Sequence, residues 1–282
     1  MYIKKVAVIG AGTMGADICY SIATAGIPVV LRDVSEDVLT RARQHIQELF
    51  DGRVARNKMS AADALDRMSF IVFSSNLDDM KDVTVAIEAV TEKMKVKQAV
   101  FRELDQILAP MALIVSNTSA LSITELAQAT RRPERVAGMH FFYPAHMMKL
   151  VEVIAGEKTS DETLYTVMRL AEEIRKIPVK VKECPGFVVN RVLMASMAEV
   201  LRFKEERGID AATIDQVVTK NKIAPMGPFM LADALGLDVA YEVAQTLYQT
   251  LGERFKPSDE LKQLVLQGHL GVKTGQGFYS YR

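Results

Sequence analysis

Cysteine is scarce in this chain. Cys19 and Cys184 are the 2 cysteines among 282 residues. Two thiols cannot build the disulfide framework of a small secreted protein, so the composition favours a reducing compartment. A catalytic thiol would also need a neighbouring base, and the sequence identifies none.

The chain also lacks an excess of positive or negative residues and a long apolar run. Lys and Arg number 35, Asp and Glu number 35, and the formal net charge is +0. This balance gives no electrostatic reason to expect nucleic acid or an anionic membrane as a partner. No apolar run approaches the ~20 residues of a membrane span, and the first expected strand leaves no room for a signal peptide. We expect a cytoplasmic protein, unless a targeting segment precedes this sequence.

Metal-ligand patterns and internal repeats are also absent from the sequence. His45, His146 and His269 have no ligand spacing with one another or with the cysteines. We therefore predict no bound metal. No repeat indicates a solenoid or propeller.

Apolar runs alternate with helical patterns through the first half of the chain. Strands are expected at Lys5–Ile9 and Ile27–Asp33, and Ser35 is placed to cap the helix that follows. Further short apolar runs read "FIVFSS", "VTVAIEAV", "ALIVSNTS" and "RVAGMHFF". This alternation predicts an α/β fold of the Rossmann type, a mainly parallel sheet with helices on both faces.

The pattern changes at "KECPGF", where Pro185 and Gly186 interrupt it. Beyond this point the expected elements are helices, at 188–206, 211–219, 229–235, 237–251 and 258–267. We predict two domains: residues 1–184, which bind a nucleotide, and residues 185–282, smaller and nearly all α.

The segment "VAVIGAGTMG" places Gly10, Gly12 and Gly15 between an expected strand and a helix. In a dinucleotide-binding turn, the first glycine permits the turn, the second admits a pyrophosphate and the third allows close packing. Asp33 then ends the second expected strand, where a carboxylate accepts hydrogen bonds from the adenosine ribose and repels a 2′-phosphate. The set predicts NAD rather than NADP, although the guanidinium of Arg32 would screen such a phosphate. An ordinary tight turn is the alternative.

Downstream motifs narrow the chemistry. They read "EAVTEKMKVK", "SNTSALSIT", "MHFF-P---MKLVEVI", "PGFVVNR", "PMGPF" and "GVKTGQGFY". With the glycine loop, these motifs resemble the L-3-hydroxyacyl-CoA dehydrogenase family, close to the bacterial 3-hydroxybutyryl-CoA dehydrogenases, over nearly the full length. The resemblance implies an NAD-dependent oxidoreductase of fatty-acid and butanoate metabolism that interconverts (S)-3-hydroxyacyl-CoA and 3-ketoacyl-CoA. It also implies a homodimer formed through the second domain.

The resemblance assigns the catalytic roles to four residues. His140 would be the base that takes the proton of the substrate hydroxyl, and Glu152 would orient and stabilise its imidazolium form. Ser119 and Asn190 would hydrogen-bond the substrate oxygen. Taken singly, each has an ordinary alternative: a core histidine, a solvated carboxylate or amide, and a helix cap.

Binding residues follow from the same resemblance. The implied cofactor contacts are Gly10, Gly12, Thr13, Met14, Gly15, Asp33, Glu92, Lys97, Tyr143 and Lys273. Arg53, Arg56 and Lys58 would meet the phosphates of coenzyme A, together with Ser119 on the substrate side. A solvated basic loop is the alternative for the first three.

One position departs from the family pattern. Where members usually carry asparagine after "HFF", this chain has Tyr143. A ring in this place is expected to narrow the acyl pocket and favour short chains. A related dehydrogenase that acts on a hydroxy acid without coenzyme A is the alternative function.

Overall fold

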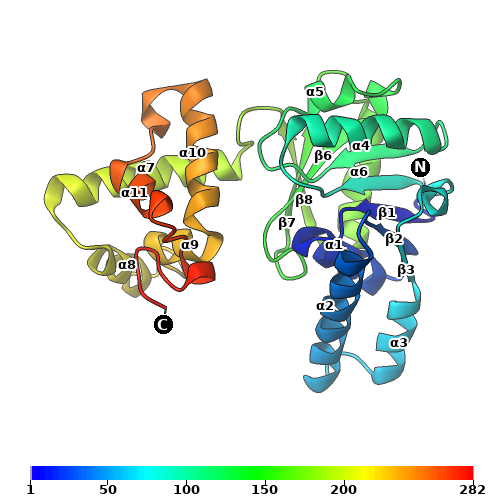
Figure 1. Cartoon of the computed structure of the whole chain (residues 1–282), viewed down its shortest axis with the longest axis horizontal. Helices are drawn as coiled ribbons and strands as arrows, with labels where there is room; N and C mark the ends of the chain where they lie inside the picture. Colours follow the sequence, from blue (N-terminus) through cyan, green and yellow to red (C-terminus); the bar gives the residue numbers. More distant parts are fainter. Residues whose placement is uncertain (1, 282) are drawn as a thin grey trace. The chain divides into compact units, whose positions relative to one another are not determined.

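The computed structural model describes residues 2–281, which form two compact units divided between Glu183 and Cys184. The N-terminal unit holds an eight-stranded sheet (Figure 1). Its strands are β1 Val6–Ile9, β2 Val29–Arg32, β3 Ile71–Ser74, β4 Val85–Glu88, β5 Leu113–Ser116, β6 Val136–Phe141, β7 Leu150–Ala155 and β8 Ile177–Lys182.

The strands run in the order β3-β2-β1-β4-β5-β6-β7-β8. Neighbouring strands are parallel except β6 and β7, which pair antiparallel. The order reverses direction between β1 and β4, and open α/β sheets bind ligands outside the carboxyl ends of strands at such a point. The predicted fold class, a mainly parallel Rossmann-type sheet followed by helices, is confirmed.

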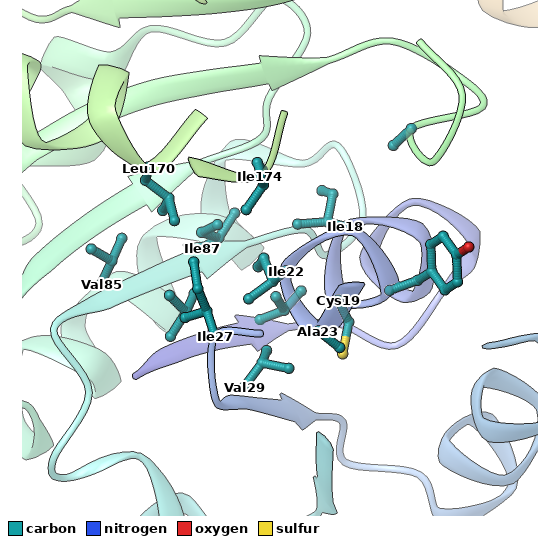
Figure 2. Packing of buried hydrophobic residues seen from close by; sticks show 14 of the residues in the cluster. Ile18, Cys19, Ile22, Ala23, Ile27, Val29, Val85, Ile87, Leu170 and Ile174 are labelled. Carbon is teal, nitrogen blue, oxygen red and sulfur yellow. The ribbon is translucent and has the colours of Figure 1, made fainter. Parts of the chain in front are cut away.

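Helices cover both faces of this sheet. They are α1 Thr13–Thr24, α2 Glu36–Ala55, α3 Ala61–Ser69, α4 Met94–Ile107, α5 Ile123–Ala127 and α6 Asp161–Glu173, with short 3-10 turns at Leu77–Met80 and Pro133–Arg135. Helices α1, α2, α3 and α6 share one apolar core with the sheet. Figure 2 shows part of it, where Ile18 and Ile22 of α1 lie near Ile87 of β4 and Ile174 after α6.

Strand alternation assigns side chains to the two faces. Val85 and Ile87 of β4 belong to the core of α1, so Glu88 points to the opposite face, where α4 packs. The same alternation places Met139 of β6 in the α1 core and His140 on the α4 side. The sheet thus has an apolar face under α1 and a face under α4 that gathers charged groups at the carboxyl ends of the strands.

The C-terminal unit is helical, apart from isolated β-bridges near its end. Its helices are α7 Val189–Arg207, α8 Ala211–Lys220, α9 Pro228–Leu235, α10 Leu237–Leu251 and α11 Asp259–Leu266, with 3-10 turns at Glu253–Phe255 and Val272–Thr274. Phe229 and Leu237 are fully buried in one apolar cluster, and Leu247 is buried in another. These helices match the expected ones to within a residue or two at each end.

Helices α3 and α6 and strand β8 were not among the elements expected from the sequence. Helix α3 has one buried residue, Ala64, and strand β8 exposes most of its side chains. Among the described residues, no helix combines the length and hydropathy that crossing a membrane requires.

Candidate active site

The glycine loop joins β1 to α1 and uses each glycine differently. Gly10 has a φ of +101°, and a Cβ there would lie 2.7 Å from the carbonyl oxygen of Ala89. A Cβ on Gly15 would lie 1.8 Å from the carbonyl oxygen of Gly10, so helix α1 can approach the strand only without one. A Cβ on Gly12 would meet no described atom within 4 Å, so the loop is open at this point.

Asp33 is tied to this loop. Its carboxylate accepts hydrogen bonds from the backbone N–H of Ala11 at 2.8 Å and of Ser35 at 3.1 Å. The neighbouring Arg32 is buried on the other face of the sheet, where its guanidinium lies 3.7 Å from Glu103 of α4. Since Arg32 faces away from Asp33, its charge is directed away from the carboxylate that a ribose would meet.

His140 and Glu152 form a buried pair. They lie directly opposite each other in the antiparallel register of β6 and β7. The Nδ1 atom of His140 is 2.9 Å from Oε2 of Glu152, and the two residues are 4% and 1% exposed. An ionised carboxylate only accepts hydrogen bonds, so Nδ1 of His140 is the donor in this contact. A carboxylate-fixed imidazole of this kind suits proton transfer.

A second charged cluster occupies the ends of β4 and β5. Lys97 of α4 is 1% exposed, and its ammonium donates to Oε1 of Glu88 at 2.7 Å. Glu88 also accepts from the hydroxyl of Ser116 and the N–H of Val90, both at 2.7 Å. Burial raises the pKa of the Glu88 carboxyl above its ordinary value, and the charge of Lys97 offsets part of this rise. The cluster therefore fixes α4 against the sheet edge.

Glu92 extends this cluster to the loop after β5. Its Oε2 lies 3.1 Å from the ammonium of Lys97, while Oε1 accepts from the N–H of Ser119 at 2.8 Å and from the hydroxyl of Thr118 at 2.5 Å. Ser119 is thus held by a carboxylate. It does not cap α5, because that helix begins after Ser122, whose hydroxyl accepts from the N–H of Glu125.

Comparison with known proteins gives a consistent family. Residues 5–184 match the family described as 3-hydroxyacyl-CoA dehydrogenase, NAD binding domain, and residues 186–281 match its C-terminal domain. The chain belongs to the 3-hydroxyacyl-CoA dehydrogenase family. The resemblance expected from the motifs is therefore confirmed.

Individual relatives support this membership. A 3-hydroxybutyryl-CoA dehydrogenase of Clostridioides difficile is 38% identical over 278 residues, covering 98% of this chain and 99% of that protein. The fatty acid oxidation complex subunit alpha of Idiomarina loihiensis is 39% identical over 281 residues, and the chain spans 39% of that subunit's length. The structure of (S)-3-hydroxybutyryl-CoA dehydrogenase PaaH1 from Ralstonia eutropha matches with a TM-score of 0.96 at 36% identity, covering 100% of both chains.

The loop residues fit the cofactor of this family. The first turn of α1 has no side-chain cap at Gly12, and its exposed N–H groups and positive dipole end suit a pyrophosphate. The open space at Gly12 admits that group, and the Asp33 carboxylate suits a ribose without a 2′-phosphate. Thr13 and Met14 form the first turn of the same helix.

Two residues around the site were missed by the sequence reading. The side-chain oxygen of Asn117 accepts from the N–H of Phe141 at 2.9 Å and so fixes the strand end beside His140. Glu88 was missed although its signal was visible: a charged residue inside the apolar run "VTVAIEAV" is expected to have a buried partner. Asn117 gave no such signal, because its partner is a backbone group distant in sequence.

Three predicted residues belong to other segments of the chain. Asn190 is in the first turn of α7 and Lys273 lies in the C-terminal unit, where its ammonium contacts the carboxylate of Asp238 at 2.5 and 2.6 Å. Tyr143 is 56% exposed on the connection between β6 and β7. Tyr143 belongs to the N-terminal unit, and Asn190 and Lys273 belong to the C-terminal unit.

The basic segment belongs partly to a helix. Arg53 is in the last turn of α2, Arg56 follows its end and donates to the carbonyl oxygen of Gly52 at 2.8 Å, and Lys58 is exposed in the turn before α3. Two of these three cations are exposed. The two cysteines are free, and burial raises the pKa of the Cys19 thiol, which does not suit a nucleophile.

Proposed function

We propose that this protein is an NAD-dependent L-3-hydroxyacyl-CoA dehydrogenase that interconverts (S)-3-hydroxyacyl-CoA and 3-ketoacyl-CoA. Short acyl chains, with 3-hydroxybutyryl-CoA as the type substrate, are the proposed range. The observation that carries the proposal is the buried contact between His140 and Glu152, on the same sheet as a glycine loop suited to NAD. Relatives named 3-hydroxybutyryl-CoA dehydrogenase, aligned over nearly their whole length, support the substrate class.

The proposed chemistry assigns a proton to His140. In the oxidative direction, Nε2 takes the proton of the C3 hydroxyl, and Nδ1 keeps its hydrogen bond to Glu152. Glu152 stabilises the imidazolium that forms, because its negative charge is buried beside it. Bound NAD supplies the hydride acceptor for C3, and NADH the donor in reverse. In the reductive direction, His140 returns the proton to the carbonyl oxygen.

Other residues would bind and orient the substrate. Ser119, held through its N–H by Glu92, is proposed to donate its hydroxyl to the substrate oxygen, with Asn190 in a similar role. Glu92 and Lys273 are proposed near the nicotinamide half, and Lys97, whose ammonium contacts Glu88 and Glu92, would act through Glu92. Arg53, Arg56 and Lys58 are proposed to meet the phosphates of coenzyme A.

The assay is NADH oxidation, followed by its absorbance, with acetoacetyl-CoA as the substrate. We expect turnover with the thioester and little with free acetoacetate at equal concentration. Comparable turnover of the free acid, without inhibition by coenzyme A, would instead favour a dehydrogenase of a CoA-free hydroxy acid. Absence of turnover with either compound, in a protein that binds NADH, would contradict the proposed reaction.

A homodimer formed through the C-terminal unit is part of the proposal. This unit exposes large apolar side chains, among them Val192, Ile223, Val239 and Leu266. A dimer interface would remove side chains of this kind from water. Light scattering at micromolar concentration is expected to give twice the monomer mass, and a monomeric mass would contradict this. We propose that the enzyme works in the cytoplasm, where its cysteines remain thiols.

A further inference from the structure

A polar cluster around a buried carboxylate lies outside the groups used so far. Asp17 of α1 is 1% exposed, and its two carboxylate oxygens contact two histidines. Oδ1 lies 2.8 Å from Nε2 of His45 in α2, and Oδ2 lies 2.8 Å from Nδ1 of His146. The backbone N–H of His146 also approaches Oδ2, at 3.4 Å. A buried carboxylate without such donors would be costly, so the three residues form one unit.

The hydrogen positions follow from this arrangement. The carboxylate of Asp17 only accepts, so the facing nitrogen of each imidazole carries a hydrogen. The rings of His45 and His146 are 6.5 Å apart, and the ring of Tyr20 meets that of His146 edge-on at 6.2 Å. Both histidines are therefore held in one orientation by a single side chain of α1.

The cluster fixes the connection between the two catalytic strands. His146 lies between β6, which carries His140, and β7, which carries Glu152. The ammonium of Lys176 holds the same connection by donating to the carbonyl oxygens of Ala145 at 2.5 Å and Met148 at 2.9 Å. Burial lowers the pKa of Lys176, and the charge of Asp17 offsets only part of this lowering.

The other end of the cluster reaches the nucleotide loop. Asp17 is in the second turn of the helix that the glycine loop begins. His45 lines an open hollow of about 460 Å³ together with Gly12, Thr13 and Arg41. One carboxylate thus links the loop suited to the cofactor with the chain segment that joins His140 to Glu152.

We infer that Asp17 is a positioning residue that, through His45 and His146, fixes the connection after His140 relative to the glycine loop and α2. This inference rests on the proposed function, because it concerns how the base and the cofactor site keep their relative place. The effect is expected on the chemical step, since a displacement of about 1 Å between reacting groups costs up to about a hundredfold in rate. The affinity for NADH is expected to stay near that of the parent, because the glycine loop itself is unchanged.

The test compares four variants with the parent. Asp17→Asn removes the charge and one acceptor, and His146→Leu removes the donor. His146→Asn and His45→Gln keep an N–H at the corresponding atom, Nδ1 and Nε2 respectively. Titration with NADH gives the concentration of competent sites, and kcat is expressed per site. We expect a loss of about tenfold or more for Asp17→Asn and His146→Leu, an almost unchanged NADH affinity, and most of the parent kcat for the two amide variants.

Asp105→Asn is the matched control. Asp105 is also a buried carboxylate of the N-terminal unit, 4% exposed, with Arg131 and Arg132 as partners. Its variant is expected to lose stability but to keep kcat per site. If Asp17→Asn behaves like this control, Asp17 is a structural residue and the inference is overturned. If the amide variants lose as much kcat as His146→Leu, the donor N–H groups are not what positions the segment.

A second measurement does not depend on turnover. Hydrogen exchange over residues 142–149 is expected to accelerate in Asp17→Asn and His146→Leu, but not in Asp105→Asn. Unchanged exchange in all variants would overturn the inference even if the protein reduces no acyl-CoA. A parent without activity, combined with accelerated exchange, would instead count against the proposed function alone.

Discussion

The buried carboxylates of the two units have different hydrogen-bond partners. In the N-terminal unit, Glu152 contacts a histidine, Asp17 contacts two, and Glu88 contacts a lysine. In the C-terminal unit, Asp215 and Asp233 accept hydrogen bonds from backbone N–H groups and tyrosine hydroxyls. Imidazole changes its proton state near neutral pH, whereas a backbone amide does not. The partner, more than burial itself, separates a candidate for chemistry from a structural carboxylate.

The C-terminal pair stabilises the end of the chain. Asp233 accepts from the N–H groups of Phe278 and Tyr279 and from the hydroxyl of Tyr281, each at 2.9 Å. A Cβ on Gly277 would lie 2.1 Å from Oδ1 of Asp233, so glycine is needed there. Burial and the adjacent carboxylate raise the pKa of the Tyr281 hydroxyl, because this hydroxyl donates to a negative charge. The Asp233 carboxylate thus holds the C-terminal segment against α9.

The largest effect is expected for His140→Ala. This variant tests whether the buried carboxylate that contacts a histidine, Glu152, takes part in the reaction through that histidine. Removing the base should lower kcat by about a hundredfold or more, the usual scale of acid–base catalysis. NADH affinity, measured by fluorescence titration, should barely change. A variant that keeps most of its kcat would exclude His140 from proton transfer.

Asp233→Asn tests the other side of the comparison. The amide turns one acceptor into a donor that faces donors, which costs about 1–3 kcal/mol in unfolding free energy. Urea unfolding measures the loss, and kcat per NADH-binding site should stay near that of the parent. A large fall of kcat per site in a folded variant would erase the distinction between the two kinds of carboxylate.

Asp33→Ala tests a carboxylate whose protein donors are both backbone groups but which is proposed to meet the cofactor. The loss of hydrogen bonds and of repulsion toward a 2′-phosphate should raise the ratio of kcat/KM for NADPH over NADH by about tenfold. Asp33→Asn, which keeps an acceptor for the N–H of Ala11, separates the charge from the loop contact. An unchanged ratio in both variants would show that Asp33 does not discriminate between the cofactors.

Tyr143 gives the smallest expected effect. Tyr143→Phe should keep the chain-length profile and lose about 0.5–1.5 kcal/mol of transition-state stabilisation, the worth of one hydrogen bond. Tyr143→Asn should raise the relative kcat/KM for acyl chains of six carbons and longer if the ring is the wall of the pocket. The check is kcat/KM over a series of 3-ketoacyl-CoA thioesters, and two variants identical to the parent would mean that the ring faces away.

Much of the fold was predictable because its signals are local. The apolar period gave β1 and α10, and the Ser35 cap of α2 is present, with its hydroxyl accepting from the N–H of Val38. Helix α3 and strand β8 were not predicted, because their side chains are mostly exposed and their place depends on neighbouring elements.

The sequence named His140 and Glu152 as partners, but it did not indicate the contacts that other buried carboxylates make. The motifs named His140 and Glu152, and the register of two strands brings them together. The contacts of Asp17 with His45 and His146 join residues distant in sequence, so no spacing could indicate them. The motifs "PMGPF" and "GVKTGQGFY" contain Gly227 and Gly277, which leave room for Asp215 and Asp233. Part of their pattern therefore reflects packing around buried carboxylates.

The proposed mechanism requires that His140 and Glu152 act as one unit, and a double-mutant cycle in kcat tests this directly. Glu152→Gln should lower kcat, because a neutral amide cannot stabilise the imidazolium. In the background of His140→Ala, the same change should have almost no further effect, since groups that act as a unit are not additive. If the two losses multiply in the double variant, Glu152 acts independently of His140, and the proposed acid–base pair is contradicted.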